Sequence, residues 1–209
     1  MLFRRFQFLD PGPLIDGELE LVRPDPQWFD ALLAACNHPL TVQDAPAESK
    51  TTRKQLDQFL HVAPWGHEGA DSSPGRVPQY HFWMRIRPDA PMKLGSNRPQ
   101  IEMAGGIGLR VGSTHAIEMY YGHFGYHVYP AARGHHYAER SCRLLFALAR
   151  RHGLKTLWVT CNPDNYGSRR TCEALGGRLA SIVPVPESDP LYVRGEREKC
   201  RYRIDLLGR

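Results

Sequence analysis

The sequence has no apolar run of about 18 residues, so we predict no membrane-spanning helix. It also lacks the pattern of a secretory signal, because residues 1–13 contain two arginines but neither a continuous apolar core nor a small-residue cleavage site. The five cysteines are odd in number and form no C-x-x-C pair, which is typical of free thiols in a reducing compartment. We therefore expect a cytoplasmic protein without a membrane segment.

Long runs of like charge are also missing. The formal net charge is +5, but the basic residues are scattered in short doublets such as Arg150-Arg151 and Arg169-Arg170. This distribution does not favour a nucleic-acid partner, and attraction of a small polyanionic ligand is enough to account for it. The chain has no internal repeat and an ordinary globular composition, with 42% hydrophobic and 23% charged residues, so we predict a single domain over residues 1–209.

The clearest structural patterns lie in residues 122–177. Residues 123–129 alternate in aromatic and β-branched side chains, which predicts a strand. A helix is predicted next, through Arg151, because small and apolar residues recur at helical spacing: Ser141, Leu144, Leu145 and Leu148. The apolar run 156–161 predicts a buried strand, and a second helix is expected over 166–175. The unit is therefore strand, helix, strand, helix.

The flanking segments extend this unit on both sides. We expect further strands at 17–22, 79–86, 101–111, 179–185 and 199–206, and further helices at about 26–37 and 50–62. This set predicts an α/β fold of mixed α+β character, with about seven strands in a mostly antiparallel mixed sheet and about four flanking helices. One parallel pair of strands is expected around the crossover helix.

Two segments are predicted to lie outside this framework. Residues 1–13 form either an N-terminal arm or an extra strand, and the sequence does not decide between them. Residues 64–78 are rich in glycine, serine and proline and have no periodicity, which predicts a flexible loop. Our hypothesis is that this loop forms a flap beside a substrate pocket.

The first strand-to-helix junction carries the chemistry. Gly134 lies in a turn that opens the predicted helix, whose first amides have no partners within the helix. These amides and the helix dipole favour an anion, best a phosphate or diphosphate, and Arg133 adds a positive charge. The alternative is an ordinary loop before an ordinary helix.

A longer pattern around this junction resembles a known family. It reads G-H-x-G-Y-x-V-x-P-x-x-R-G-x-x-Y-A from Gly122, then a strand ending in Thr-Cys-Asn, then N-x-x-S-x-x-x-x-E-x-L-G-G up to Gly177. The pattern resembles the GCN5-related N-acetyltransferase (GNAT) superfamily, and most of all its small bacterial acetyltransferases of unassigned substrate. The resemblance implies a GNAT-like acyl-CoA acyltransferase fold. It also implies direct transfer of an acetyl group from acetyl-CoA to an amine within a ternary complex.

The same resemblance implies a set of coenzyme-binding residues. The loop that would bind the diphosphate consists of Arg133, Gly134, His135, His136, Tyr137 and Ala138. Val128 and Tyr129 would line the thioester, where this strand splays from the next one. Asn165 and Ser168 would contact the pantetheine arm.

Two residues depart from the family pattern. His136 stands where the family usually has glycine, and we expect its side chain to be tolerated if the backbone is right-handed there. Cys172 stands where many members carry a tyrosine that protonates the leaving thiolate. A thiol could take that role, although a small buried packing residue is the other interpretation of Cys172.

Transfer to an amine needs a base that removes a proton from the amine. His123 is the first candidate, since it lies on the strand that would line the thioester, and a packed histidine is the alternative. Glu118 is the second candidate, although a turn carboxylate is often only solvated. His123 and His127 share one strand face, but no spacing here matches a zinc site, so we predict no metal.

The competing hypothesis is a module that keeps this fold and binds CoA or RNA without catalysis. It is motivated by the unusual residues at positions 136 and 172. The acceptor, either a small-molecule or a peptide amine, is not revealed, because its specificity would reside in residues 34–78, which contain no readable motif. The oligomeric state is equally open, with a homodimer among the options.

Overall fold

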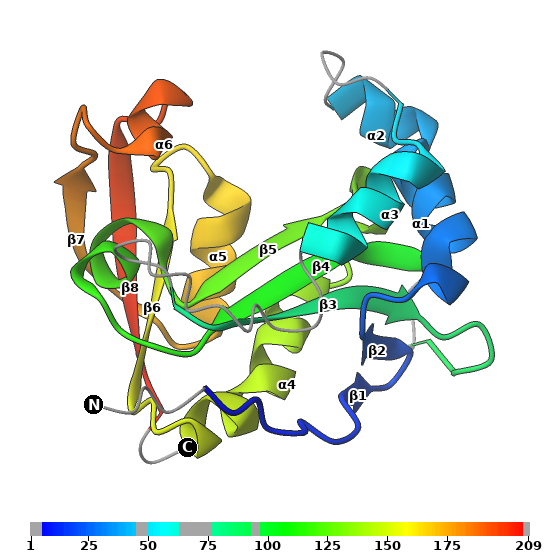
Figure 1. The fold of residues 1–209 in the computed structure, drawn as a ribbon, viewed down its shortest axis with the longest axis horizontal. Coiled ribbons are helices and arrows are strands. Elements are labelled where there is room, and N and C mark those ends of the chain that lie inside the picture. The colour runs from blue at the N-terminus through cyan, green and yellow to red at the C-terminus, as the bar shows by residue number, and fades with distance from the viewer. Residues whose placement is uncertain (1–5, 45–49, 63–76, 93–96, 207–209) are drawn as a thin grey trace.

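The computed structural model describes residues 6–44, 50–62, 77–92 and 97–206, which form two antiparallel sheets (Figure 1). The larger sheet has the strand order β1 (Ile15–Asp16), β2 (Leu19–Val22), β3 (Gln79–Ile86), β4 (Met103–Arg110) and β5 (Phe124–Val128). The smaller sheet has the order β6 (Thr156–Cys161), β8 (Glu198–Asp205) and β7 (Arg178–Pro184). The two sheets diverge from a common point between β5 and β6.

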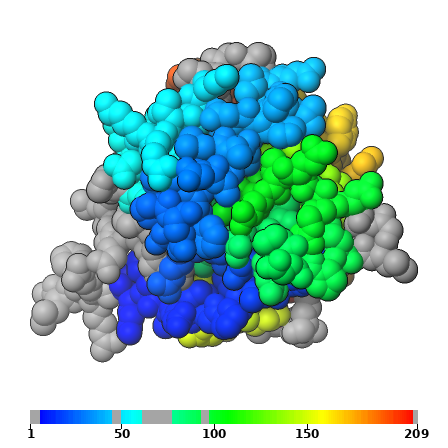
Figure 2. Space-filling model, turned by 90° about the vertical axis from the view of Figure 1, so that its right-hand side faces the viewer, coloured from blue at the N-terminus to red at the C-terminus, as the bar shows by residue number. Residues whose placement is uncertain are grey.

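The helices fall into groups on the two faces of the larger sheet. On one face lie α1 (Phe29–Cys36), which follows the 3₁₀ turn η1 (Pro26–Trp28), and the helices α2 (Pro39–Asp44) and α3 (Arg53–Val62). Helix α4 (Tyr137–Arg151) lies on the other face. The remaining helical segments are η2 (Ile117–Tyr121), η3 (Pro130–Ala132), α5 (Tyr166–Ala174) and α6 (Pro190–Val193). Figure 2 shows α1–α3, in blue to cyan, beside the green residues of the larger sheet and its connections.

Helix α4 forms because its apolar stripe has a sheet to cover. Leu145 and Leu148 on this stripe are buried, and the ring of Phe146 stacks on that of Phe124 in β5 with 6.3 Å between centroids. The helix ends at Arg151, and two residues later Gly153 has a φ of 82°, the left-handed conformation that glycine adopts most easily. The predicted helix through Arg151 is therefore confirmed.

The strand register decides which side chains face which helices. Trp83 and His127 lie opposite the same residue of β4 and so share one face of the sheet. The ring of Phe59 in α3 stacks on Trp83, so this is the face toward α1–α3. Odd-numbered residues of β5 face α1–α3, and even-numbered residues such as Phe124 face α4.

The predicted fold class is confirmed, with one difference in the sheet. We expected a single mixed sheet with a parallel pair around the crossover helix, but β5 and β6 share no ladder in the part of the chain that the structure describes. Two short helices, α2 and α6, and the helical turn η2 were not predicted. Each has fewer than seven residues, which is too short for a helical periodicity to show in the sequence.

The N-terminal segment contributes packing rather than a strand over its described part. Residues 6–14 form no strand, and the amide of Leu9 donates to the hydroxyl of Tyr80 at 2.6 Å. The ring of Phe8 packs edge-on against Tyr80, with 4.9 Å between centroids. The predicted loop 64–78 lies almost wholly outside the described residues, so the hypothesis of a flap is unchanged.

Candidate active site

Strands β5 and β6 meet at one point, formed by Gly122 and His123. The His123 amide donates to the carbonyl oxygen of Trp158 at 2.6 Å, and the Trp158 amide donates to Nδ1 of His123 at 2.9 Å. Gly122 has a φ of 66°, and a Cβ there would lie 3.0 Å from the amide nitrogen of Thr160. Only glycine fits this approach without strain, so the contact point depends on residue 122.

Beyond this contact the strands separate into a cleft of about 1540 Å³. Its walls come from β5, the loop before α4, the end of β6 and helix α5. Eight of the predicted coenzyme-binding residues line it: Val128, Arg133, Gly134, His136, Tyr137, Ala138, Asn165 and Ser168. Tyr129 is not among the lining residues, and its hydroxyl lies 3.0 Å from Sγ of Cys36 in α1. His135 is also absent from the lining, and its ring stacks on Tyr137.

The wall formed by β5 offers free backbone groups to the cleft. Arg110 donates its amide to the His123 carbonyl at 2.8 Å, and the Tyr129 amide donates to the Ala104 carbonyl at 2.8 Å. Since bonded positions alternate along an antiparallel pair, the odd-numbered residues of β5 bond to β4. The amides and carbonyls of the even-numbered residues therefore point into the cleft, as a row suited to an extended chain of amides, and of these the Val128 carbonyl already accepts from Nε of Arg133.

The start of α4 offers a second set of free amides. No side chain caps this helix, and the first bond across its N-terminus is from the Arg140 amide to the His136 carbonyl at 2.9 Å. In the described part of the chain, the amides of residues 134–139 donate to no acceptor. Together with the helix dipole they form an anion site.

Arg133 lies beside this site but is already paired. Its guanidinium bonds to both carboxylate oxygens of Asp44 at the end of α2, at 2.7 and 3.2 Å. Its Nε donates to the Val128 carbonyl at 3.3 Å. The pair lowers the pKa of Asp44 through the hydrogen bond from Arg133. The loop before α4 is thereby connected to the helices on the other face of the sheet.

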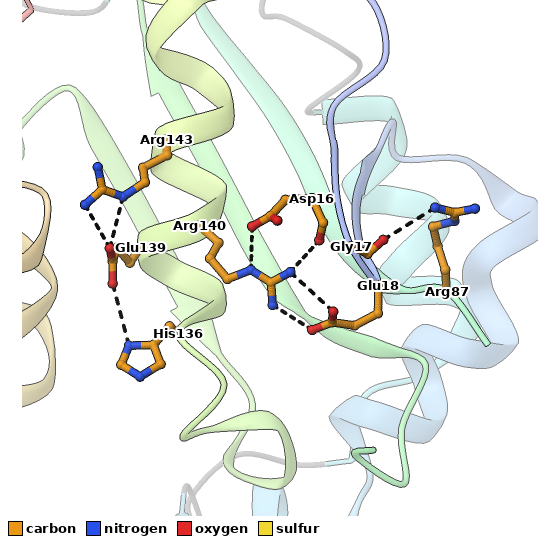
Figure 3. Close-up of polar contacts among 8 residues, drawn as sticks. All are labelled: Asp16, Gly17, Glu18, Arg87, His136, Glu139, Arg140 and Arg143. Atoms are coloured by element: carbon orange, nitrogen blue, oxygen red, sulfur yellow. Dashed lines mark hydrogen bonds and ion pairs between the residues drawn. The ribbon is translucent and has the colours of Figure 1, made fainter. Parts of the chain in front are cut away.

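The condition set for a side chain at His136, a right-handed backbone, is not met. Its φ of 58° and ψ of 23° are left-handed, which costs a residue with a Cβ roughly 1–2 kcal/mol. The imidazole is 76% exposed, and its Nδ1 lies 3.6 Å from a carboxylate oxygen of Glu139 (Figure 3). The side chain thus points toward Glu139 and is largely exposed to solvent.

The first turn of α4 is held by a buried ionic cluster (Figure 3). Arg140 is 5% exposed and donates to a carboxylate oxygen of Asp16 and to one of Glu18, each at 2.6 Å. Burial alone would raise the pKa of Glu18, but the hydrogen bond and charge of Arg140 outweigh burial and lower it. This cluster fixes the helix start against the β1–β2 hairpin, and so fixes the direction of the free amides.

His123 is buried at the contact point rather than on the cleft wall. Burial lowers its pKa to about 4, so the ring is neutral at pH 7. Because Nδ1 accepts from the Trp158 amide, the proton belongs on Nε2, which lies 3.2 Å from the Ser113 hydroxyl. Glu118 lies in η2 away from the cleft lining, and its carbonyl accepts from Arg201 at 2.8 Å. Both base assignments stay predictions.

Cys172 lies behind the cleft wall. It is fully buried, and a hydrogen bond to Cys161 together with burial raises its pKa. Cys161 lines the cleft, and the hydrogen bond from Cys172 lowers its pKa to about 7. An acid role for Cys172 stays a prediction.

Sequence reasoning missed His127 as a functional candidate. It lines the cleft from β5, on the face toward α1–α3, and within the described residues neither ring nitrogen has a hydrogen-bond partner. The side chain of His127 is exposed to the cleft, and desolvation by the surrounding cleft walls lowers its pKa, so its ring is neutral at pH 7. The alternation of β5 places His127 on the same face as His123, but only the structure shows that His127 reaches the open part of the cleft.

Within residues 6–44, 50–62, 77–92 and 97–206, no group of three histidine, cysteine or acidic side chains could hold a metal ion. Across the same ranges, no helix is both long and apolar enough to cross a membrane.

The two sets of free backbone groups together define a class of protein. An anion site at a helix start, followed by a free strand edge, suits a ligand that joins a diphosphate to an extended amide chain. Coenzyme A has this construction, so the fold and the cleft define a CoA-dependent acyltransferase.

The chain belongs to the acetyltransferase (GNAT) domain family, whose sequence model matches residues 18–178. The predicted family and enzyme class are thus confirmed: the protein is an acyltransferase, with acetyl-CoA as its co-substrate. A search of curated protein sequences finds no significant match.

Solved structures share the fold at low sequence identity. A GCN5-related N-acetyltransferase from Brucella melitensis has a TM-score of 0.63 at 16% identity, over 96% of this chain and 81% of its own. The microcin C7 self-immunity acetyltransferase MccE, in complex with acetyl-CoA and AMP, has a TM-score of 0.62 at 14% identity, over 92% and 94%. The ribosomal L7/L12 α-N-protein acetyltransferase RimL, in complex with coenzyme A, has a TM-score of 0.56 at 16% identity, over 92% and 96%.

Proposed function

We propose that the protein transfers an acetyl group from acetyl-CoA to the amine of an acceptor by direct attack in a ternary complex. The observation that carries this proposal is the cleft between β5 and β6, which is closed at His123 and open along the free backbone groups of β5. Strand β5 has α4 on one face and α1–α3 on the other, so the cleft beside it has two sides from which two different ligands can enter. The coenzyme would occupy the α4 side and the acceptor the opposite side.

The coenzyme would be held mainly by backbone groups. The amides of residues 134–139 would bind the diphosphate, with Arg133 beside them. The pantetheine arm would run along β5 to the thioester near Val128 and Tyr129. The side chain of Asn165 caps α5 by accepting from the Ser168 amide at 3.0 Å, which orients both residues toward the arm.

His127 would accept the proton of the amine. Its ring is neutral, lies in the cleft and has free nitrogens, as a general base requires. The amine nitrogen then forms a bond to the thioester carbon, the carbon–sulfur bond breaks, and the leaving thiolate of CoA takes up the proton that the attacking nitrogen loses as the amide forms. For His123 we propose the role of joining β5 to β6, which sets the position of His127 four residues further along.

The test is release of free CoA thiol over a panel of amines, with His127→Gln as the main variant. We expect kcat to fall about 100-fold, the usual size of general-base catalysis, with the Kd of acetyl-CoA unchanged in calorimetry. The wild-type kcat/KM should rise with pH through the lowered pKa of His127, and the variant should lack this step. An unchanged kcat would contradict the role of His127.

The same assay separates the enzyme from the alternative of a non-catalytic module. Turnover with any amine excludes a purely binding role. Binding of acetyl-CoA without thiol release from any amine, or steeply salt-dependent RNA binding without turnover, would favour the alternative. As a control at the coenzyme loop, Arg133→Glu should weaken acetyl-CoA binding at least about tenfold, since it places a carboxylate beside the diphosphate.

A further inference from the structure

Arg110 ends strand β4 on the side of the cleft that faces α1–α3. Register places it opposite His123, on the same sheet face as Gly125 and His127. Its guanidinium lies over the bare backbone of Gly125, where an added Cβ would be 3.6 Å from both Nη1 and Nη2. The side chain lines the cleft together with Gly125 and His127.

The guanidinium of Arg110 has donors that the protein does not use. Nη1 donates to the carbonyls of Tyr121 and Gly122, at 3.1 and 3.0 Å. In the described structure, Nε and Nη2 have no acceptor, and no carboxylate contributes to the electrostatics of Arg110. Burial lowers the pKa of Arg110, which is the effect expected of a cation without a counter-charge.

Two other guanidinium groups that are largely covered, those of Arg140 and Arg85, are neutralised by carboxylates of the protein. Arg140 pairs with Asp16 and Glu18, and Arg85 pairs with Glu20 and Glu102. Since an uncompensated buried charge is costly, a protein keeps one where a ligand supplies the opposite charge.

A second arginine that lines the cleft also has no carboxylate partner within the described parts of the chain. Arg194 also lines the cleft, acts electrostatically on Tyr121 as Arg110 does, and makes no side-chain ion pair in the described residues. Glu196 also lines it, but Glu196 is neutralised by Lys199. Arg110 and Arg194 therefore both bring to the cleft lining a positive charge for which no ion pair is found in the described residues.

We infer that the acceptor is an amine that carries an anionic group, a carboxylate or a phosphate, a few bonds from its nitrogen, and that Arg110 binds this group. This inference rests on the proposed function, in which the amine lies beside His127. Gly125 and His127 are two residues apart on one face, which corresponds to about 7 Å along the strand. An anion on Arg110 and an amine on His127 would thus be separated by only a short linker.

The experiment compares matched acceptors that differ in the anion. Glycine, β-alanine and 4-aminobutyrate vary the spacing and are each paired with their amides, while 2-aminoethyl phosphate is paired with ethanolamine. We expect kcat/KM to favour the anionic member of the best pair by about 30-fold or more, since charge-assisted hydrogen bonds to a guanidinium are strong. The carboxylate and phosphate arms identify which anion the site takes.

Variants assign the preference to Arg110. Arg110→Gln should reduce the ratio within the best pair to about threefold or less, and Arg110→Lys should retain part of it because it keeps the charge but not the fork of donors. Arg203→Gln, which removes the same charge from an exposed position on β8, should leave the ratio unchanged. Acetyl-CoA affinity and thermal unfolding of each variant show whether the cleft and the fold are intact.

The outcomes separate this inference from the proposed function. Equal or better use of the neutral partners by the wild type, inertness of every anionic amine, or an unchanged ratio in Arg110→Gln would each overturn the role of Arg110. Failure of the wild-type protein to bind acetyl-CoA would instead contradict the proposed function itself.

Discussion

Two largely covered arginines, in two regions of the molecule, differ in whether the protein supplies a carboxylate to balance their charge. At the start of α4, hydrogen bonds to Glu18 and Asp16 outweigh burial and raise the pKa of Arg140. At the junction of β4, β5 and β6, burial prevails and lowers the pKa of Arg110. Arg140 holds the start of α4 and thereby orients its free backbone amides, whereas Arg110 keeps unused hydrogen-bond donors that a ligand could accept from. Complete pairing indicates a structural role, and incomplete pairing indicates a binding role.

The sharpest test of this comparison is the stability of two truncations. Arg140→Ala should lower the free energy of unfolding by about 3–5 kcal/mol, because it leaves Glu18 buried without its partner. Arg110→Gln should cost only about 1 kcal/mol, since it removes two bonds to carbonyls and no ion pair. Urea unfolding of both variants measures the difference, and equal losses would show that the two regions are not distinct.

The second test uses pH at the junction of the sheets. The folded pKa of His123 is lowered to about 4 from 6.5, so protonation favours the unfolded chain. The contribution of neutral His123 to the free energy of unfolding is therefore complete above pH 6.5 and is lost as pH falls toward 4. The loss is about 2 kcal/mol between pH 7.5 and 5.

His123→Asn is the matched variant for this test, because its amide oxygen can still accept from the Trp158 amide but does not titrate. The difference in unfolding free energy between wild type and variant should shrink by that amount as the pH is lowered. A difference that is constant from pH 7.5 to 5 would show that His123 is not held neutral.

The smallest expected effect is at the loop that α4 holds in place. His136→Gly should raise the unfolding free energy by about 0.5–1 kcal/mol, because relief of the left-handed strain exceeds the added freedom of the unfolded chain. His136→Ala keeps the Cβ and should give no such gain. Thermal unfolding of the two variants provides the measurement, and a stabilised alanine variant would refute the explanation by strain.

Local patterns were sufficient to predict the elements that form the cleft. The strands at 79–86 and 156–161 have the bounds that alternation and apolar run length predicted, and α4 ends next to the predicted glycine. These features depend on neighbours within one turn or one strand, which a sequence displays directly. The same holds for the free amides after Arg133, since they depend only on where the helix begins.

The remaining features depend on distant contacts. Arg133 pairs with Asp44, 89 positions earlier, in a helix too short to show periodicity. His123 and His127 share a predicted strand face, yet one is covered by β6 and the other is not, because the strands separate between them. The position of this separation follows from one pair of bonds to Trp158, and nothing local to β5 encodes it.

The contact at His123 also has a consequence for how the cleft can evolve. An imidazole nitrogen takes the position where a continuous ladder would place a peptide oxygen, so the reach of one side chain sets the spacing at which the two sheets start to part. We therefore expect a substitution at this single position to change the width of the opening while the residues that line it stay the same.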